Sequence, residues 1–469
     1  MKSKNYPFFF ILFIFPFVLF GKGYRIEFQL PEKTASVIFL AHYFGDKVLV
    51  IDSLQLDKKN HGVFKGDTLL DQGIYMLATQ KHRFFDFLVE NDQSIFIEAN
   101  SSTEIENLKI LKSKEAQRFL CFQQEMSRLK KMQQEMKNRL ELNSTNPDSI
   151  SVFKGQLVEL DREVNLFWKK EIEKNQHNFY GKFIRAMMAP EMPPSKIPDT
   201  HPMHDSLQWV YEYNWRKDHF FDHIDFGDDR LLRTPVFHRK MMLYFNKFLL
   251  QIPDSINRQV DKVLARARSN GNMFRYMANF LLKSFKESKI MGMDASFVHL
   301  AENYYLTREI QIDSLMYEKL YREVQLLKPT LIGTIARDLL MEDPEGIHYR
   351  LHQMNADYSV VLFWEPDCGH CRVQVPQLYK EVFLPLREKG VKVFAVYTQD
   401  DKEKWIDFIQ KNNLYEWINV YDPENLSHFR SFYKIETTPV IYILDHKKRI
   451  VAKNIDIPTV QKWLENHLR

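Results

Sequence analysis

The stretch VVLFWEPDCGHCRVQVP, residues 360–376, decides how this sequence is interpreted. An apolar run typical of a buried strand ends at Trp364, and a helical pattern begins just after Cys368. Cys368 and Cys371 are two of only three cysteines among 469 residues. Three interpretations of this close pair compete: half of a zinc site, a short structural disulfide, or a redox centre.

The zinc and disulfide interpretations explain the pair less well. A structural zinc site needs four ligands, but no second cysteine pair is present, and His370 lies too close to complete a tetrahedral site. A disulfide across so short a spacer closes a very small loop and gains little stability from entropy. A thiolate at a helix N-terminus is stabilised by the helix dipole and becomes the attacking species. The sequence therefore favours a redox pair, with Cys368 as the exposed nucleophile and Cys371 as the resolving thiol.

Together with TTPVIYILD, residues 437–445, this segment resembles the thioredoxin superfamily, in particular the exported TlpA/ResA-like thiol-disulfide oxidoreductases. The resemblance covers residues 329–469 and implies an α/β thioredoxin fold. It implies a redox-active Cys368–Cys371 disulfide and a cis bond before Pro439, with Thr438 pairing with the backbone of a substrate. No cofactor is expected, because the cysteine pair itself carries two electrons.

Two carboxylates of the family pattern are missing here. The buried aspartate of thioredoxin, six residues before the first cysteine, is replaced by Leu362. The glutamate that TlpA/ResA-like proteins often carry three residues after the second cysteine is replaced by Gln374. Both carboxylates help to remove the proton of the resolving thiol, so the proton acceptor for Cys371 stays open. Glu365 is the candidate substitute, and a solvated loop acid is the alternative.

The residues between the two cysteines are Gly369 and His370, which resembles protein disulfide isomerase more than thioredoxin. A histidine at this position can stabilise the neighbouring thiolate as a cation, and a stabilised reduced form makes a stronger oxidant. The sequence therefore predicts a potential less reducing than that of thioredoxin. With Trp364 and Glu365, His370 forms the predicted supporting set around the cysteines.

The N-terminus, residues 1–23, reads MKSKNYPFFFILFIFPFVLFGKG and predicts a signal peptide. Its apolar run, Phe8 to Phe20, is shorter than the roughly 20 residues that a membrane span requires. We therefore expect an exported protein of the periplasm or cell envelope. An uncleaved signal anchor is the alternative, because bulky Leu19 and Phe20 precede the cleavage site. Three cysteines are too few for an exported disulfide scaffold.

Hydrophobic patterning predicts three domains after the signal peptide. Residues 24–105 alternate like short strands and predict an antiparallel β-sandwich-like domain. Residues 106–328 predict an α-helical domain, interrupted by an irregular proline-rich stretch at 188–204. Both parts resemble uncharacterised regions that precede exported thioredoxin-like domains. Residues 329–469 alternate strands and helices. The net charge of +4, with both signs interspersed, gives no reason to expect a nucleic-acid partner.

For three other groups of side chains, we expect structural roles and not functional ones. His219 and His223 have the spacing of helix-borne zinc ligands, but they lack the glutamate of H-E-x-x-H, so a solvated or packed pair is favoured over a metal site. Cys121, flanked by apolar residues in a helical pattern, is expected to be buried as a small hydrophobe, with a regulatory or intermolecular thiol as the alternative. HKKR, residues 446–449, is expected to be a solvated hairpin tip.

The predicted function is thiol-disulfide exchange with protein thiols or disulfides, as a reductase or an isomerase, with the direction of electron flow open. Continuous turnover would require a membrane redox partner. A narrower version restricts the substrates to apocytochrome c cysteines before haem attachment. The alternative is an envelope binding or scaffold protein whose thioredoxin fold serves mainly as a docking module.

Overall fold

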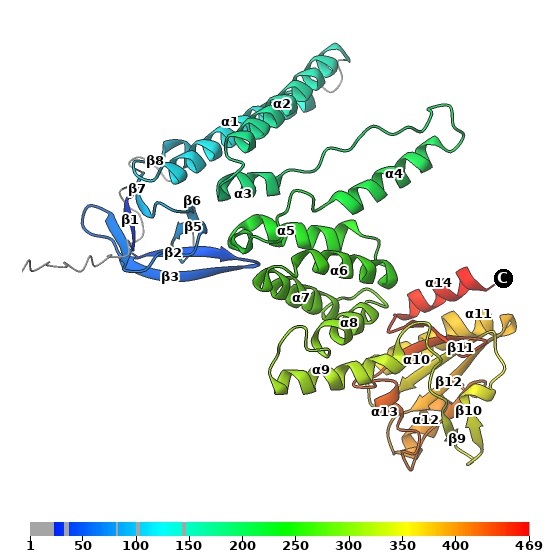
Figure 1. Cartoon of the computed structure of the whole chain (residues 1–469). Helices are drawn as coiled ribbons and strands as arrows, with labels where there is room; N and C mark the ends of the chain where they lie inside the picture. The colour runs from blue at the N-terminus through cyan, green and yellow to red at the C-terminus, as the bar shows by residue number, and fades with distance from the viewer. Residues whose placement is uncertain (1–22, 32–36, 81–82, 100–103, 143–146, 469) are drawn as a thin grey trace, which may run out of the picture. The chain divides into compact units, whose positions relative to one another are not determined.

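The computed structural model describes residues 23–31, 37–80, 83–99, 104–142 and 147–468, so the predicted signal peptide lies almost wholly outside the described residues. Contacts divide the chain into two compact units, Met1–Tyr244 and Phe245–Arg469 (Figure 1). This division falls inside the predicted helical domain. The predicted boundaries at 105/106 and 328/329 stay predictions.

The strands of the first unit form two four-stranded sheets, with orders β4-β1-β7-β8 and β3-β2-β5-β6. Alternating side chains of these strands, such as Ile26 and Phe28, are buried in a shared core. The predicted β-rich domain is confirmed, but β1 and β7 pair in parallel, so its first sheet is mixed and not antiparallel throughout. The strands are β1 Tyr24–Gln29, β2 Val37–Phe44, β3 Lys47–Gln55, β4 His61–Gly66, β5 Gly73–Ala78, β6 Arg83–Val89, β7 Ser94–Glu98 and β8 Lys109–Ile110.

The described remainder of the first unit is mostly helical, apart from the irregular residues 189–203, and the two long helices, α1 and α2, lie side by side (Figure 1). Phe122 of α1 stacks on Phe167 of α2. Cys121, on the same turn of α1, is exposed, so the prediction that it is buried was wrong: Phe122 takes the position facing α2. The helices are α1 Lys114–Leu142, α2 Pro147–Lys174, α3 Phe179–Met187, α4 His204–His219 and α5 Pro235–Leu243.

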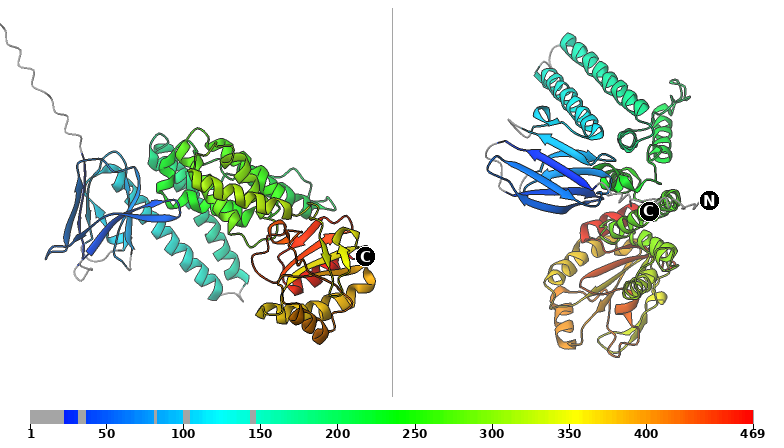
Figure 2. Two further views of the ribbon diagram at one scale, coloured as in Figure 1. Left: turned by 90° about the horizontal axis from the view of Figure 1, so that it is seen from below. Right: turned by 60° about the vertical axis from the view of Figure 1, so that its left-hand side comes forward.

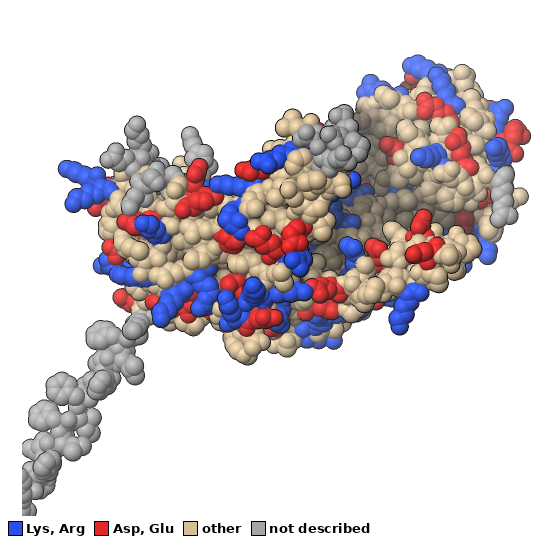
Figure 3. All heavy atoms as spheres, turned by 90° about the horizontal axis from the view of Figure 1, so that it is seen from above, with Lys and Arg blue, Asp and Glu red and all other residues tan. Residues whose placement is uncertain are grey.

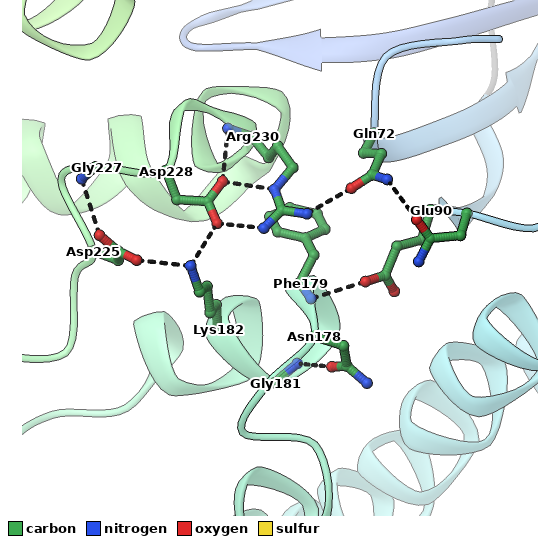
Figure 4. A network of polar contacts seen from close by, with 11 residues as sticks. Gln72, Glu90, Asn178, Phe179, Gly181, Lys182, Asp225, Gly227, Asp228 and Arg230 are labelled. Carbon is green, nitrogen blue, oxygen red and sulfur yellow. Dashed lines mark hydrogen bonds and ion pairs between the residues drawn. The ribbon is translucent and has the colours of Figure 1, made fainter. Parts of the chain in front are cut away.

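A polar network joins the strands and the helices of this unit (Figure 4). Arg230 donates to the Gln72 side chain at 2.6 Å and to Asp228, while the Phe179 N–H donates to the Glu90 carboxylate at 2.8 Å. These bonds satisfy polar groups that would be costly to leave unpaired in a largely buried environment.

On the face drawn in Figure 3, basic and acidic side chains are interspersed.

The second unit begins with a helical bundle that leads into an α/β domain. Along α7, one face carries the buried residues Met273, Phe274, Met277, Ala278, Leu281, Leu282 and Phe285, at the three- and four-residue spacing of an amphipathic helix. The bundle consists of α6 Pro253–Ala267, α7 Gly271–Lys286, α8 Asp294–Leu300 and α9 Ser314–Leu327. Within the described part of the chain, no helix has the length and hydropathy to cross a membrane.

A five-stranded sheet of order β13-β12-β11-β14-β15 forms the centre of the α/β domain. Strands β12 and β13 run parallel to β11, whereas β14 is antiparallel to it. The sheet comprises β11 Tyr358–Trp364, β12 Val391–Tyr397, β13 Ile418–Val420, β14 Val440–Asp445 and β15 Ile450–Lys453, and a small hairpin is formed by β9 Leu340–Glu342 and β10 His348–Arg350.

Both faces of this sheet are covered (Figure 2). Val360, Leu362 and Trp364 of β11 face one core, and Val361 and Phe363 face the other. The first core is completed by helices α10 Gly369–Gln377, α12 Lys402–Asn412 and α14 Ile457–His467, and the second by α13 Phe429–Phe432. β11 is therefore a buried central strand. The residues that follow it lie at the edge of the sheet where β11 and the parallel strand β12 both end.

One detail of the hairpin between β14 and β15 differs from expectation. Lys448 is buried, and its ammonium group donates to the Met354 carbonyl at 2.6 Å and to the Ser359 hydroxyl at 2.8 Å. His446, Lys447 and Arg449 are exposed, as expected of a solvated hairpin tip, and the prediction was wrong for Lys448 alone.

Candidate active site

The two cysteines lie at the junction between strand β11 and helix α10. Cys368 is the N-cap of α10, with φ −74° and ψ 121°, and its sulfur accepts a hydrogen bond from the Cys371 N–H at 3.3 Å. The first N–H groups of a helix lack intrahelical partners and point toward its N-terminus. The local fold thus aims backbone donors at the Cys368 sulfur, as the sequence predicted.

Exposure separates the two thiols. Cys368 is half-buried at the surface, whereas Cys371 is 0% exposed and packs in the core with Trp364 and Val375. Both are free thiols in this structure, so the reduced dithiol is the state described. Of these two thiols, only that of Cys368 can be reached directly by another protein.

The loop that contains Thr438 and Pro439 is distant from Cys368 in sequence but lies beside it in the fold. The Thr438–Pro439 bond is cis, and the Cys368 thiol donates to the Thr438 carbonyl at 3.2 Å. The sheet brings these residues together: β14 runs antiparallel to β11 with Val440 opposite Phe363, so the residues before β14 lie beside those after β11. The cis bond before Pro439 is the one that the family resemblance implied.

Glu365 ties this loop to the neighbouring strand. Its carboxylate accepts hydrogen bonds from the Thr438 hydroxyl at 2.9 Å, the Thr398 hydroxyl at 3.3 Å and the Gln399 side-chain amide. Within the described residues, no hydrogen bond joins this carboxylate to the Cys371 sulfur. Its contacts fit a positioning residue, whereas its candidacy as a proton acceptor stays a prediction.

The surroundings shift the pKa values of the two thiols in opposite directions. Burial raises the pKa of Cys368, but hydrogen bonds from Cys371, with contributions from Thr438 and the His370 backbone, outweigh it and bring the pKa below its ordinary value of 9.0. Burial raises the pKa of Cys371 to about 12. Near neutral pH, Cys368 is the thiol prepared to act as a nucleophile, and Cys371 is held protonated.

This asymmetry predicts selective alkylation. We expect the rate at which iodoacetamide modifies reduced Cys368 to rise with pH through a midpoint below 9.0, because the thiolate is the reactive form. Cys371 should stay unmodified over that range, since its pKa is about 12. The measurement is peptide-resolved mass spectrometry in a Cys121→Ser background, because Cys121 is exposed.

Glutathione, alkylated in parallel, supplies the reference profile of an ordinary thiol. A Cys368 midpoint at or above that of glutathione, or equal labelling of Cys368 and Cys371, would contradict the assigned roles.

Comparison with known proteins found matches to this domain. The sequence model of the AhpC/TSA family matches residues 332–453. A domain of a possible thiol-disulfide isomerase from Cytophaga hutchinsonii is 36% identical, over 29% of this chain and 92% of that one, with a TM-score of 0.28. The chain is a TlpA-like member of the thioredoxin superfamily.

Further similarities concern the same domain and the region before it. The thioredoxin domain of a thiol-disulfide oxidoreductase from Bacteroides vulgatus is 25% identical, over 29% of this chain and 98% of that one, with a TM-score of 0.28. A thioredoxin-like protein from Bacteroides caccae is 19% identical, over 60% and 98%, with a TM-score of 0.46. Residues 170–328 match a domain of unknown function, DUF5106. A search of curated proteins found no match.

The other predicted site residues of this TlpA-like protein lie around the cysteines. His370 is exposed on the first turn of α10, and Trp364 is buried, with its ring against Tyr397 and Phe408. Leu362, at the position of the missing aspartate, lies in the apolar core. No ionisable side chain therefore replaces the aspartate at that position.

The two histidines considered as metal ligands have other partners. His219 interacts with the Asp222 carboxylate at 2.6 Å, and His223 with the Met188 carbonyl at 3.4 Å. Among the described residues, no group of three or more histidine, cysteine, aspartate or glutamate side chains is arranged to hold a metal ion.

Sequence reasoning missed Thr398 and Gln399, which directly follow β12. A signal for them existed, because the carboxyl ends of parallel neighbouring strands meet at one edge of a sheet. The residues after β12 were therefore bound to lie beside Glu365, and the Thr398 N–H donates to the Trp364 carbonyl at 3.0 Å.

Proposed function

We propose that this TlpA-like protein catalyses thiol-disulfide exchange with protein thiols or disulfides through its CGHC motif. One observation carries the proposal: a half-buried Cys368 with a lowered pKa caps α10, beside buried Cys371 and 3.2 Å from the carbonyl of the cis-proline loop. This arrangement provides a nucleophile, a resolving thiol and a backbone segment able to hold a substrate strand.

In the reductive direction, the Cys368 thiolate attacks one sulfur of a substrate disulfide. A mixed disulfide forms, and the other substrate sulfur leaves as a thiolate that takes up a proton. Cys371 then loses its proton and attacks the Cys368 sulfur, which forms the Cys368–Cys371 disulfide and releases the second substrate thiol. Two electrons pass to the substrate, and the reverse sequence oxidises a dithiol.

The cell envelope is the proposed location, and the basis for it is the sequence of residues 1–23. An oxidised or reduced enzyme must be regenerated after each turnover. The proposed partners are therefore protein substrates that carry thiols or disulfides, and a membrane redox partner.

The deciding experiment is the reduction potential of the Cys368/Cys371 couple, measured by equilibration with glutathione buffers. We expect a two-electron transition at a potential above about −270 mV, the value for thioredoxin, because the lowered Cys368 pKa stabilises the reduced form. A Cys368→Ser, Cys371→Ser variant should show no transition. Absence of a transition in the unaltered pair would exclude the enzyme and favour the scaffold interpretation.

A further inference from the structure

A cleft of about 680 Å³ opens beside the cis-proline loop, within the second unit. One wall comes from the end of α7, the loop that connects it to α8, the start of α8, and α9, and the other from the cis-proline loop, β14 and β15. Its lining includes Pro439 and Gln374, which belong to the surroundings of the redox site. The helical region thus forms one wall of a cleft that adjoins the cis-proline loop.

The helical wall is fastened firmly to the sheet. Lys453 of β15 is buried, and its ammonium group pairs with Asp294 of α8 and donates to the Thr330 carbonyl at 2.6 Å. The segment after α9 also bonds to β15, since the Gly333 N–H donates to the Ile450 carbonyl at 2.7 Å. The cleft therefore has walls held by buried polar bonds.

Two apolar side chains stand exposed on the helical wall. Ile290 is 44% and Met291 37% exposed, both on the loop between α7 and α8. A bound partner that covers these two apolar side chains would gain binding free energy, because burying apolar area is favourable. Among the charged residues of the lining, Glu323 is engaged by Lys286 at 2.5 Å and Lys434 at 3.8 Å, and Asp294 is engaged by Lys453.

The opposite wall includes Thr437, and Thr438 adjoins it outside the lining. In the described part of the chain, the N–H groups of Thr437 and Thr438 have no hydrogen-bond partner, and Thr437 is exposed. An extended polypeptide could satisfy them by pairing alongside the loop, as an added strand does. Its cysteine would then lie near the Cys368 sulfur, which is 3.2 Å from the Thr438 carbonyl.

We propose that this cleft binds an extended, cysteine-bearing segment of a protein substrate and that Ile290 and Met291 select an apolar side chain close to that cysteine. The proposal rests on the proposed function and adds a role for the helical region, which is to choose among substrates. The chemistry stays with Cys368 and Cys371.

The test uses two ten-residue peptides, each with one cysteine activated as a mixed disulfide with thionitrobenzoate. They differ only in a leucine or a serine two residues from the cysteine. Reduced protein in a Cys121→Ser background attacks the peptide sulfur, and thionitrobenzoate leaves as a coloured thiolate. We expect the leucine peptide to react about tenfold faster, the effect of partly burying one such side chain.

Ile290→Ser and Met291→Ser should each remove most of that preference and leave the rate with dithionitrobenzoate, a small disulfide, unchanged. Leu315→Ser is the matched control, because Leu315 is 65% exposed and lies outside the cleft lining. This variant should keep the preference.

Two results would overturn the inference: equal rates for the two peptides, or a preference that survives both cleft substitutions. Either would leave the proposed function standing if dithionitrobenzoate still reacts at Cys368. Failure of Cys368 to react with any of the reagents would overturn the proposed function as well.

Discussion

Replacing Cys371 with alanine is expected to leave Cys368 joined to substrate proteins as a stable mixed disulfide. The reason is geometric: the buried Cys371 thiol lies one helical turn from the Cys368 sulfur and is the group placed to displace a bound partner. Turnover should fall on the order of a thousandfold, the scale on which loss of a covalent catalytic group is felt. Non-reducing electrophoresis after an acid quench would detect the adducts.

The controls separate this outcome from adventitious coupling. Every variant carries Cys121→Ser, because an exposed thiol on α1 could form mixed disulfides of its own. Cys371→Ser places a hydroxyl, which cannot displace the partner, at the position of the thiol and should trap partners as alanine does. Cys368→Ser should trap none. Equal adduct yields from the Cys368 and Cys371 variants would contradict the assignment of nucleophile and resolving thiol.

Lys453→Ala is expected to lower the free energy of unfolding of the second unit by about 3 kcal/mol, because removing one partner of a buried ion pair strands the other charge. Lys453 is buried, and its removal would leave the Asp294 carboxylate and the Thr330 carbonyl without their shared donor. Hydrogen exchange of peptides from β14 and β15, followed across urea concentrations, measures this local stability in the full chain.

An exposed lysine on the same domain, Lys462 of α14, provides the matched control, and Lys462→Ala should change the stability by less than about 0.5 kcal/mol. The double variant Lys453→Met, Asp294→Leu should recover part of the loss, since apolar residues of similar size often replace buried pairs well. A Lys453→Ala protein as stable as the Lys462 control would show that the buried pair does not hold the cleft wall.

The sequence predicted the elements around the cysteines well, because their causes are local. The apolar run ending at Trp364 and the helix starting after Cys368 are properties of neighbouring residues, and the structure forms both. The expectation for Cys121 failed for a related reason. Its apolar neighbours indicated burial, but which residue of a helix turn faces the partner depends on packing, and here Phe122 does so.

By itself, then, the sequence determined the strand–cysteine–helix unit, the β-rich and helical regions and the superfamily, since side-chain periodicity and helix capping act over a few residues. The tertiary structure alone decided which distant residues contact the strand–cysteine–helix unit and its domain. Cys368 and Thr438 lie 70 residues apart in the chain, and Lys453 and Asp294 lie 159 apart. Such contacts follow from strand order and helix packing, which no local pattern encodes. The cleft beside Pro439 exists only because folding brings the loop between α7 and α8 to the edge of the sheet.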